Sequence, residues 1–131
     1  MSPLKITSVS LHYDELGDPD GVTLLAGTKK LYVDLMDASG GAFLSWEEAQ
    51  KFNLPTVQNA LMVLANIQDV NAKLIEAGGT PLTGSYFTNK LYGSDVQIFG
   101  YGEGDVPYTY PMLKHSKVMH TKFKVRIIKE L

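Results

Sequence analysis

The first third of the chain alternates between apolar and polar residues. Apolar positions recur at every second residue over 9–13 and again over 31–35, which is the period of a half-buried β-strand. An acidic, turn-rich stretch at 15–21 ends the first of these strands. The short apolar run at 22–25 and the glycine-containing turn AGTKK lead into the second, so we expect a β-hairpin here.

A helical pattern replaces the alternation after the Ala-Ser-Gly-Gly sequence at 38–41. In LSWEEAQKF, Ser45 stands three residues before Glu48, which is the spacing of a capping box. Each of these side chains can accept a hydrogen bond from a free backbone N–H at the helix start. We therefore expect a short helix over 46–52. Its core-facing residues would be Trp46, Ala49 and Phe52.

A proline separates this helix from the next one. Pro55 forces Leu54 out of the helical conformation, and Thr56 is suited to cap a second helix that runs to about residue 66. Apolar residues recur there at i, i+3, i+4 and i+7, which predicts one buried stripe. The stripe residues are Val57, Ala60, Leu61 and Leu64, with Met62 and Val63 beside them.

A further helical stretch follows and ends abruptly. Asp69 can cap it, and its apolar residues keep helical spacing as far as Ala77. Gly78 can take the left-handed conformation that ends a helix, and Gly79 keeps the helix from resuming. Pro81 lacks the N–H that a continued helix needs. The chain is therefore predicted to turn here towards a sheet.

Strand-like patterns return beyond this break, over 85–89, 95–101 and 117–131. In the last segment apolar residues alternate with cations, which predicts one apolar face and one solvated cationic face. The apolar side would carry Phe123, Val125 and Ile127, and the cationic side Lys122, Lys124 and Arg126. The sequence YGEGDVPYTYP at 101–111 is predicted to be a loop.

The composition is that of an ordinary globular domain. The chain has 131 residues, of which 44% are hydrophobic and 20% charged. A chain of this length buries enough surface to fold without a disulfide or a structural metal. It contains no cysteine, which removes zinc–thiolate sites, disulfides and cysteine nucleophiles. We predict a single domain over 1–131, with strands and a hairpin in 1–41.

The charge distribution bears on possible partners. A net charge of −2 argues against nucleic acid as a ligand. Residues 114–131 hold six Lys or Arg against one Glu, and we interpret this basic end as a solvated face. No apolar stretch is long enough for a membrane span. No secretory signal is predicted in this chain, and its compartment stays open.

Tyrosines, glycines and acids crowd the segment from 91 to 111, which is the strongest functional hint in the sequence. Tyrosine offers large, rigid, amphipathic contact area and glycine allows shaped loops, so the combination suits a binding surface. The alternative is that two or three of these rings pack under their own loop. The candidate ligand-binding residues are Tyr92, Asp95, Tyr101, Glu103, Asp105, Tyr108 and Tyr110.

Catalytic and metal-binding patterns are weak in this sequence. Acids in a glycine-rich loop are typically solvated turn formers, so we do not expect them to hold a metal ion. His12, His115 and His120 share no ligand spacing. The sequence lacks a G-x-S-x-G elbow, and the alternating glycines at 100–104 precede no helix, so neither a triad nor a phosphate loop is predicted. We predict no catalytic residue, no metal and no cofactor.

Several short words of the sequence occur in a recognisable order. They are LSWEEAQKF, NLPT, VNAKLIEAGGTPL, YFTN and KFKVRIIKE. This ordered set resembles bacterial domains of the DUF1566 type, namely the Lcl C-terminal domain and the Fibrobacter succinogenes major paralogous domain. The resemblance covers residues 42–131. Such domains are similar to the C-type lectin-like fold.

The resemblance implies an α+β domain in which two or three helices pack on a small, mostly antiparallel, irregular sheet. Tyr86 and Phe87 would open a central strand of that sheet. It also implies a place on bacterial cell-surface, fimbrial or phage-related proteins. We therefore expect a non-catalytic recognition module that binds a glycan or a protein surface through loops between 91 and 111. Two alternatives remain: an assembly subunit that forms an oligomer or larger complex, and a hydrolase with scattered catalytic acids.

Overall fold

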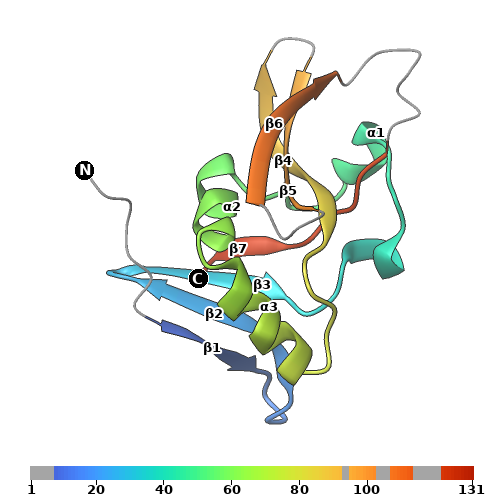
Figure 1. Ribbon diagram of the computed structural model, residues 1–131. Helices are drawn as coiled ribbons and strands as arrows, with labels where there is room; N and C mark the ends of the chain where they lie inside the picture. Colours follow the sequence, from blue (N-terminus) through green and yellow to red (C-terminus); the bar gives the residue numbers. More distant parts are fainter. Residues whose placement is uncertain (1–7, 93–94, 103–106, 114–121) are drawn as a thin grey trace.

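The computed structural model describes residues 8–92, 95–102, 107–113 and 122–131. Over these residues the chain has an α+β fold with two antiparallel sheets and three α-helices. Figure 1 shows the four-stranded sheet at the bottom of the view and the three-stranded sheet rising above it. Helix α3 packs on strands of the first sheet, and α2 packs mainly on strands of the second.

The four-stranded sheet joins the beginning of the chain to its end. It consists of β1 (Ser8–Tyr13), β2 (Pro19–Ala26), β3 (Lys29–Asp34) and β7 (Ile128–Glu130), and each neighbouring pair is antiparallel. The predicted strands and hairpin are therefore confirmed. The acidic loop is shorter than predicted, because β2 already begins at Pro19.

The core face of this sheet packs against α2 (Val57–Leu64) and α3 (Ile67–Glu76) to form the first hydrophobic cluster. Burying one such aliphatic side chain stabilises the fold by about 1.5–3 kcal/mol. The sheet contributes Val22, Leu24, Leu31, Val33 and Ile128, all at most 2% exposed. The helices contribute Ala60, Val63, Leu64, Ile67, Val70 and Leu74.

Two of the predicted helix caps, Ser45 and Thr56, are present. The Ser45 hydroxyl accepts from the Glu48 N–H at 3.2 Å, and the Glu48 carboxylate accepts from the Ser45 N–H at 3.0 Å. The Thr56 hydroxyl caps α2 by accepting from the Asn59 N–H at 3.1 Å. Helix α1 (Trp46–Ala49) is shorter than predicted. Its core side is as predicted, with Ala49 buried and both Trp46 and Phe52 half-buried.

The buried face of α2 differs from the predicted stripe. Leu61 is 48% exposed, whereas the neighbouring Val63 is fully buried. The stripe starts instead at Ala60 and continues to Ile67, the first residue of α3, because α2 meets both sheets over this face. The prediction for Leu61 was therefore wrong. Asp69 is also not the cap of α3 but lies within its first turn.

The end of α3 follows the predicted glycine chemistry. Gly78 has a φ of +83°, its N–H donates to the Ile75 carbonyl at 3.0 Å, and the Gly79 N–H donates to the Leu74 carbonyl at 2.8 Å. These two bonds form a Schellman motif. A Cβ on Gly79 would lie 2.5 Å from the Leu35 carbonyl oxygen. The chain therefore passes β3 too closely at this point for any side chain.

The second sheet is a meander of β4 (Gly84–Tyr92), β5 (Asp95–Tyr101) and β6 (Pro107–Leu113), with β5 in the centre. Two predictions need correction here. The segment at 101–111 is not one long loop, because its second half forms β6. The strand that begins with the Tyr-Phe pair is not central, because β4 lies at the edge of its sheet.

The aromatic pair after the helices connects two hydrophobic clusters. Tyr86 lies in the first cluster and stacks on Phe99, with ring centroids 5.3 Å apart. Phe87 points into a second cluster, where its ring centroid lies 5.5 Å from that of Trp46 and 5.3 Å from that of Phe123. The buried members of this second cluster are Leu44, Ala49, Leu54, Phe87, Val96, Ile98 and Val125.

The C-terminal segment is less regular than its alternation predicts. Only β7 is a ladder strand, whereas residues 122–127 make isolated bridges at Phe123 and Lys124, and 117–121 lie outside the described residues. Val125 is buried as expected. Arg126 is 0% exposed, so its placement on a solvated cationic face was wrong. The buried carbonyl and carboxylate groups around it supply the physical reason.

The exposure of α2 residues gives a direct test of the fold. Val63→Asp should lower the free energy of unfolding by more than about 4 kcal/mol, because it buries an unpaired charge in the first cluster. Leu61→Asp should change it by only about 0.5 kcal/mol, because Leu61 is half in solvent. Urea unfolding followed by circular dichroism measures both. Equal losses for the two variants would contradict this orientation of α2.

Candidate functional site

The residues predicted to bind a ligand do not form one group. Tyr92 pairs with Asp95 at one end of the meander, and Tyr101 pairs with Pro107 at the other. A strand rises by about 3.4 Å per residue, so the two ends of β5 lie about 20 Å apart. We call the end that carries Tyr92, Asp95 and Leu113 the distal end. Figure 1 shows this end of the meander projecting away from the four-stranded sheet.

Two of the remaining predicted residues lie on β6. Tyr108 is the register partner of Gly100, and Tyr110 is the partner of Ile98 near the middle of β5. Glu103 and Asp105 lie outside the described residues. The backbone register therefore spreads the described members of the predicted set along the whole length of the meander.

Tyr101 belongs to the hydrophobic core. It is 9% exposed and is a member of the first cluster, as is its strand neighbour Phe99. Its ring therefore stabilises the contact between the meander and the rest of the fold, as the packing alternative for these tyrosines describes. A substitution of Tyr101 would therefore lower the stability of the fold, and a loss of binding in that variant would not identify Tyr101 as a ligand contact.

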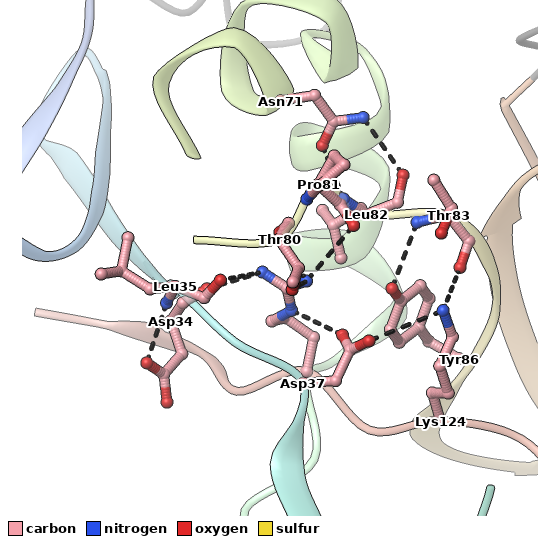
Figure 2. Close-up of polar contacts among 11 residues, drawn as sticks. Asp34, Leu35, Asp37, Asn71, Thr80, Pro81, Leu82, Thr83, Tyr86 and Lys124 are labelled. Atoms are coloured by element: carbon pink, nitrogen blue, oxygen red, sulfur yellow. Dashed lines mark hydrogen bonds and ion pairs between the residues drawn. The ribbon is translucent and has the colours of Figure 1, made fainter. Parts of the chain in front are cut away.

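Arg126 makes the densest set of polar contacts among the described residues. Its Nε donates to Asp37 Oδ1 at 2.8 Å, and its Nη1 donates to the carbonyls of Asp34 and Leu35 at 2.8 and 3.1 Å. Its Nη2 donates to the carbonyl and the hydroxyl of Thr80 at 2.8 and 3.0 Å. We call these residues the Arg126 network (Figure 2). All five guanidinium donors are used, so Arg126 has none left for a ligand.

A second cation approaches the same carboxylate. Lys124 Nζ lies 3.5 Å from Asp37 Oδ2, donates to the Thr83 carbonyl and sits 4.8 Å from the centre of the Tyr86 ring. The side chains of Lys124 and Asp37 are 13% and 9% exposed. Figure 2 shows Asp37 between the guanidinium and the lysine ammonium. Two cations therefore share one carboxylate, which leaves the site one positive charge in excess.

The phenol of Tyr86 is part of the same surroundings. Its oxygen accepts a hydrogen bond from the Thr83 N–H at 3.2 Å. Burial of the ring and the nearby charge of Asp37 disfavour the phenolate, and burial is the larger cause. Together they raise the pKa of Tyr86 to about 12, although the Thr83 N–H and Arg126 act in the opposite direction.

A small cleft opens beside this network. Met36, Asp37, Gly40, Gly41 and Thr80 line it, and its volume is about 200 Å³. We call it the Asp37 cleft. Its glycines belong to a left-handed turn that also contains Ser39 at a φ of +56°. A non-glycine residue in that conformation is uncommon and costs stability. Two of the residues that line the cleft, Asp37 and Thr80, therefore belong to the Arg126 network.

His12 also has a carboxylate partner, on the opposite face of the first sheet from the core. Its Nδ1 lies 2.6 Å from Asp20 Oδ1, and its ring meets the edge of Tyr32 at a centroid distance of 5.1 Å. The Tyr32 hydroxyl donates to the Asp20 carbonyl at 2.6 Å. Burial, followed by Asp34 and Asp20, raises the pKa of Tyr32 to about 12. His115 and His120 lie outside the described residues.

A second cleft and two absences are also found in the described part of the chain. A second cleft of about 300 Å³ lies between the α2–α3 junction, residues 64–69, and Pro107. Within the described ranges, no group of three or more His, Asp or Glu side chains is placed to hold a metal ion. None of the helices described has both the length and the apolar character needed to cross a membrane.

Only a weak local signal in the sequence points to the Arg126 network. Asp37 follows a predicted strand, and Arg126 occupies an ordinary position in an alternating segment, 89 residues away. The pairing of β3 with β7 brings them together, along with backbone bonds from Asp34 N–H to the Ile127 carbonyl and from Ala38 N–H to the Val125 carbonyl. Asp37 and Arg126 share one weak signal, which is a charge in or beside a segment with a regular apolar pattern. This signal does not identify the partner of either residue.

Comparison with known proteins adds no homologue. No family model matches the sequence, and neither a curated protein nor a solved structure matches it significantly.

The Arg126 network predicts a large loss of stability when the guanidinium is removed. Arg126→Met should lower the free energy of unfolding by about 3–5 kcal/mol, because Asp37 and several carbonyls lose their buried partner. Arg126→Lys should also destabilise, since one ammonium cannot replace a planar fork. Lys122→Met is the matched control, because Lys122 is exposed and should cost about 0.5 kcal/mol or less. Similar unfolding midpoints for Arg126→Met and its control would refute this role.

Tyr86 predicts a stability loss at alkaline pH. Its folded pKa lies above the ordinary value of 10, so the unfolded phenol ionises first. Stability is therefore unaffected below pH 10 and falls between about pH 10 and 12, by about 3 kcal/mol from this group. NMR of tyrosines labelled at Cζ measures the titration, and Tyr86→Phe identifies the signal. The prediction fails if the signal that disappears titrates near pH 10.

Proposed function

We propose that this chain is a non-catalytic recognition module with C-type lectin-like architecture, and that it binds a glycan or a protein surface with the distal end of its meander. The single observation that carries the proposal is the anchoring of the meander. Its central strand is buried on both faces, with Phe99 and Tyr101 in the first cluster and Val96 and Ile98 in the second.

Anchoring of this kind favours recognition at the free end. A strand packed on both faces is rigid, and a rigid base reduces the entropy lost when the residues at its end meet a partner. The distal end extends beyond the helices in Figure 1. Tyr92 and Asp95 are cross-strand partners there, so a tyrosine and an acid are placed side by side along the backbone.

The architecture is supported by the structural roles of the words on which the resemblance rests. LSWEEAQKF supplies the capping box of α1, and NLPT supplies the cap of α2. The Gly-Gly break forms the Schellman motif, and YFTN lies in β4. KFKVRIIKE supplies Arg126 and begins β7. Each word thus performs a framework task, in the order that the family resemblance implies.

An array of glycans and cell-surface polysaccharides, with and without calcium, tests the proposal. We expect the double variant Tyr92→Ala, Asp95→Ala to weaken binding at least about tenfold while its unfolding midpoint stays native. The matched control is Tyr13→Ala, Asp18→Ala, which removes the same two residue types at exposed positions, one at the end of β1 and one in the turn that follows it. The control should bind as the native chain does.

Two outcomes would contradict the proposal. Equal binding by the two double variants would remove the distal end from recognition. A blank array for a folded protein, together with a concentration-independent oligomer in light scattering, would favour an assembly subunit instead. Calcium dependence of any binding would show whether acids at this end hold a cation.

A further inference from the structure

Strand β1 forms one edge of the four-stranded sheet, and Figure 1 shows it as the outermost strand there. It contrasts with β4, the edge strand of the second sheet. On β4 the Phe87 N–H donates to the Lys124 carbonyl at 3.1 Å, and the Asn89 N–H donates to the Pro55 carbonyl at 2.9 Å. No such backbone bond between described residues reaches the outer side of β1. This edge is therefore open to a further strand.

The backbone groups on the open side of β1 belong to alternate residues. On β3 the Lys30 carbonyl accepts from the Leu131 N–H, and the Asp34 N–H donates to the Ile127 carbonyl, so Lys30 and Asp34 face the β7 side. Successive residues of an antiparallel strand direct these groups to opposite neighbours. The registers carry the alternation across β2 to β1. Three residues of β1 therefore direct their groups outward, and they are Val9, Leu11 and Tyr13.

The edge lacks the features that usually keep strands from pairing. Lysines, prolines and inward-pointing charges protect exposed edges in many proteins. Residues 8–13, with the sequence SVSLHY, contain no lysine, arginine, acid or proline. The register with β2 is regular up to His12 and shifts only between His12 and Tyr13. A second strand can therefore add to this edge without meeting a lysine, an acid or a missing N–H.

One antiparallel register makes β1 complementary to a second copy of itself. A two-fold axis at Leu11 places this residue opposite its own symmetry mate. It also places Val9 opposite Tyr13, and Ser10 opposite His12. The three residues with outward groups then form the hydrogen-bonded pairs, so every outward group of 9–13 in both copies is used. Opposite residues share a face of the sheet, so apolar side chains meet apolar ones and polar side chains meet polar ones.

This register also continues the hydrophobic layer under the helices. Val9 and Leu11 pack against the first cluster, so the axis brings the first clusters of the two copies side by side on the same face. Tyr13, which is 54% exposed, would cover Val9 of the second copy. Helix α3 contacts both β1 and β2. With strands about 4.8 Å apart, two such helices would lie about 10 Å apart, which is a helix-packing distance.

We propose that β1 pairs antiparallel with β1 of a second copy of this chain, so that two four-stranded sheets become one continuous sheet across a two-fold axis. Such a contact is closed, because each copy uses its single β1 edge, and assembly stops at the dimer. A strand edge buries little surface, so we expect a dissociation constant on the order of 0.1 mM. The distal end belongs to the other sheet, so this dimer holds or fails independently of the proposed function.

Sedimentation equilibrium of the full chain, from about 0.01 to about 2 mM, tests the dimer. Val9→Pro should raise the dissociation constant at least about tenfold, because it removes one outward N–H from each copy, while an edge strand tolerates proline. Val9→Ala is the matched control, because it also shortens the side chain but keeps the N–H. Its effect should be clearly smaller. Equal dissociation constants for the two variants would refute the pairing.

A second variant covers the case in which proline disturbs the fold. Ser10 is exposed, so Ser10→Lys leaves the monomer intact, yet it places a cation opposite His12 of the second copy. We expect it to raise the dissociation constant at least about fivefold. Gln50→Lys adds the same charge at an exposed position after α1 and should leave the dimer unchanged. If Ser10→Lys dimerises like its control, the proposal fails.

Amide hydrogen exchange shows whether β1 is the contact. The amides of Val9 and Leu11 should exchange slowly at about 2 mM and fast at about 0.01 mM, because only the second copy protects them. The amide of Ser10 should be protected at both concentrations, since it faces β2. A monomer at every concentration would overturn the inference. So would a dimer in which the Val9 and Leu11 amides still exchange fast, because that dimer would use another surface.

Discussion

The fold depends on one buried cation. Arg126 is fully excluded from solvent, and an isolated charge in that position would be too costly to keep. Five donors must find acceptors at once, which forces the carboxylate of Asp37 and the carbonyls that follow β3 and α3 to converge on one guanidinium. The requirement also explains the bare backbone at Gly79, because the chain after α3 must pass within hydrogen-bonding distance of β3. The end of α3, the residues that follow β3 and the segment before β7 must therefore all lie within hydrogen-bonding distance of the same guanidinium.

This polar network lies between the two hydrophobic clusters and determines how they are positioned relative to each other. Val125 belongs to the second cluster and Ile128 to the first, so the segment that carries Arg126 runs from one to the other. On β4, Tyr86 likewise belongs to the first cluster and Phe87 to the second. Lys124 contacts this part of the chain through the Thr83 carbonyl and the Tyr86 ring. Apolar packing supplies most of the favourable free energy, but it is not directional. The guanidinium, whose donors have fixed directions, determines how the clusters are aligned.

Local chemistry was readable from the sequence, whereas tertiary placement was not. The Ser45–Glu48 box, the Thr56 cap and the glycine end of α3 each involve groups within five residues of one another, so their spacing identifies them. Burial depends on what lies opposite, which periodicity does not reveal. Leu61 and Val63 are equally apolar, yet only the meeting of α2 with both sheets decides that Val63 is the buried one. Arg126 was misjudged for the same reason, because a cation signals solvent until its partners are known.

The same distinction explains why the sequence is more informative about architecture than about a ligand. The words that carry the resemblance correspond to caps, the glycine break and the arginine, all of which act within the framework. The Arg126 network, which consists of Asp34, Leu35, Asp37, Thr80 and Arg126, lies near the beginning of β4. Tyr92 lies at the other end of that strand, and Asp95 is its cross-strand partner. Replacing residues at the distal end therefore leaves the framework contacts in place. A fold arranged in this way can keep its stability while the distal end changes, so the framework residues inform about the architecture and not about a ligand.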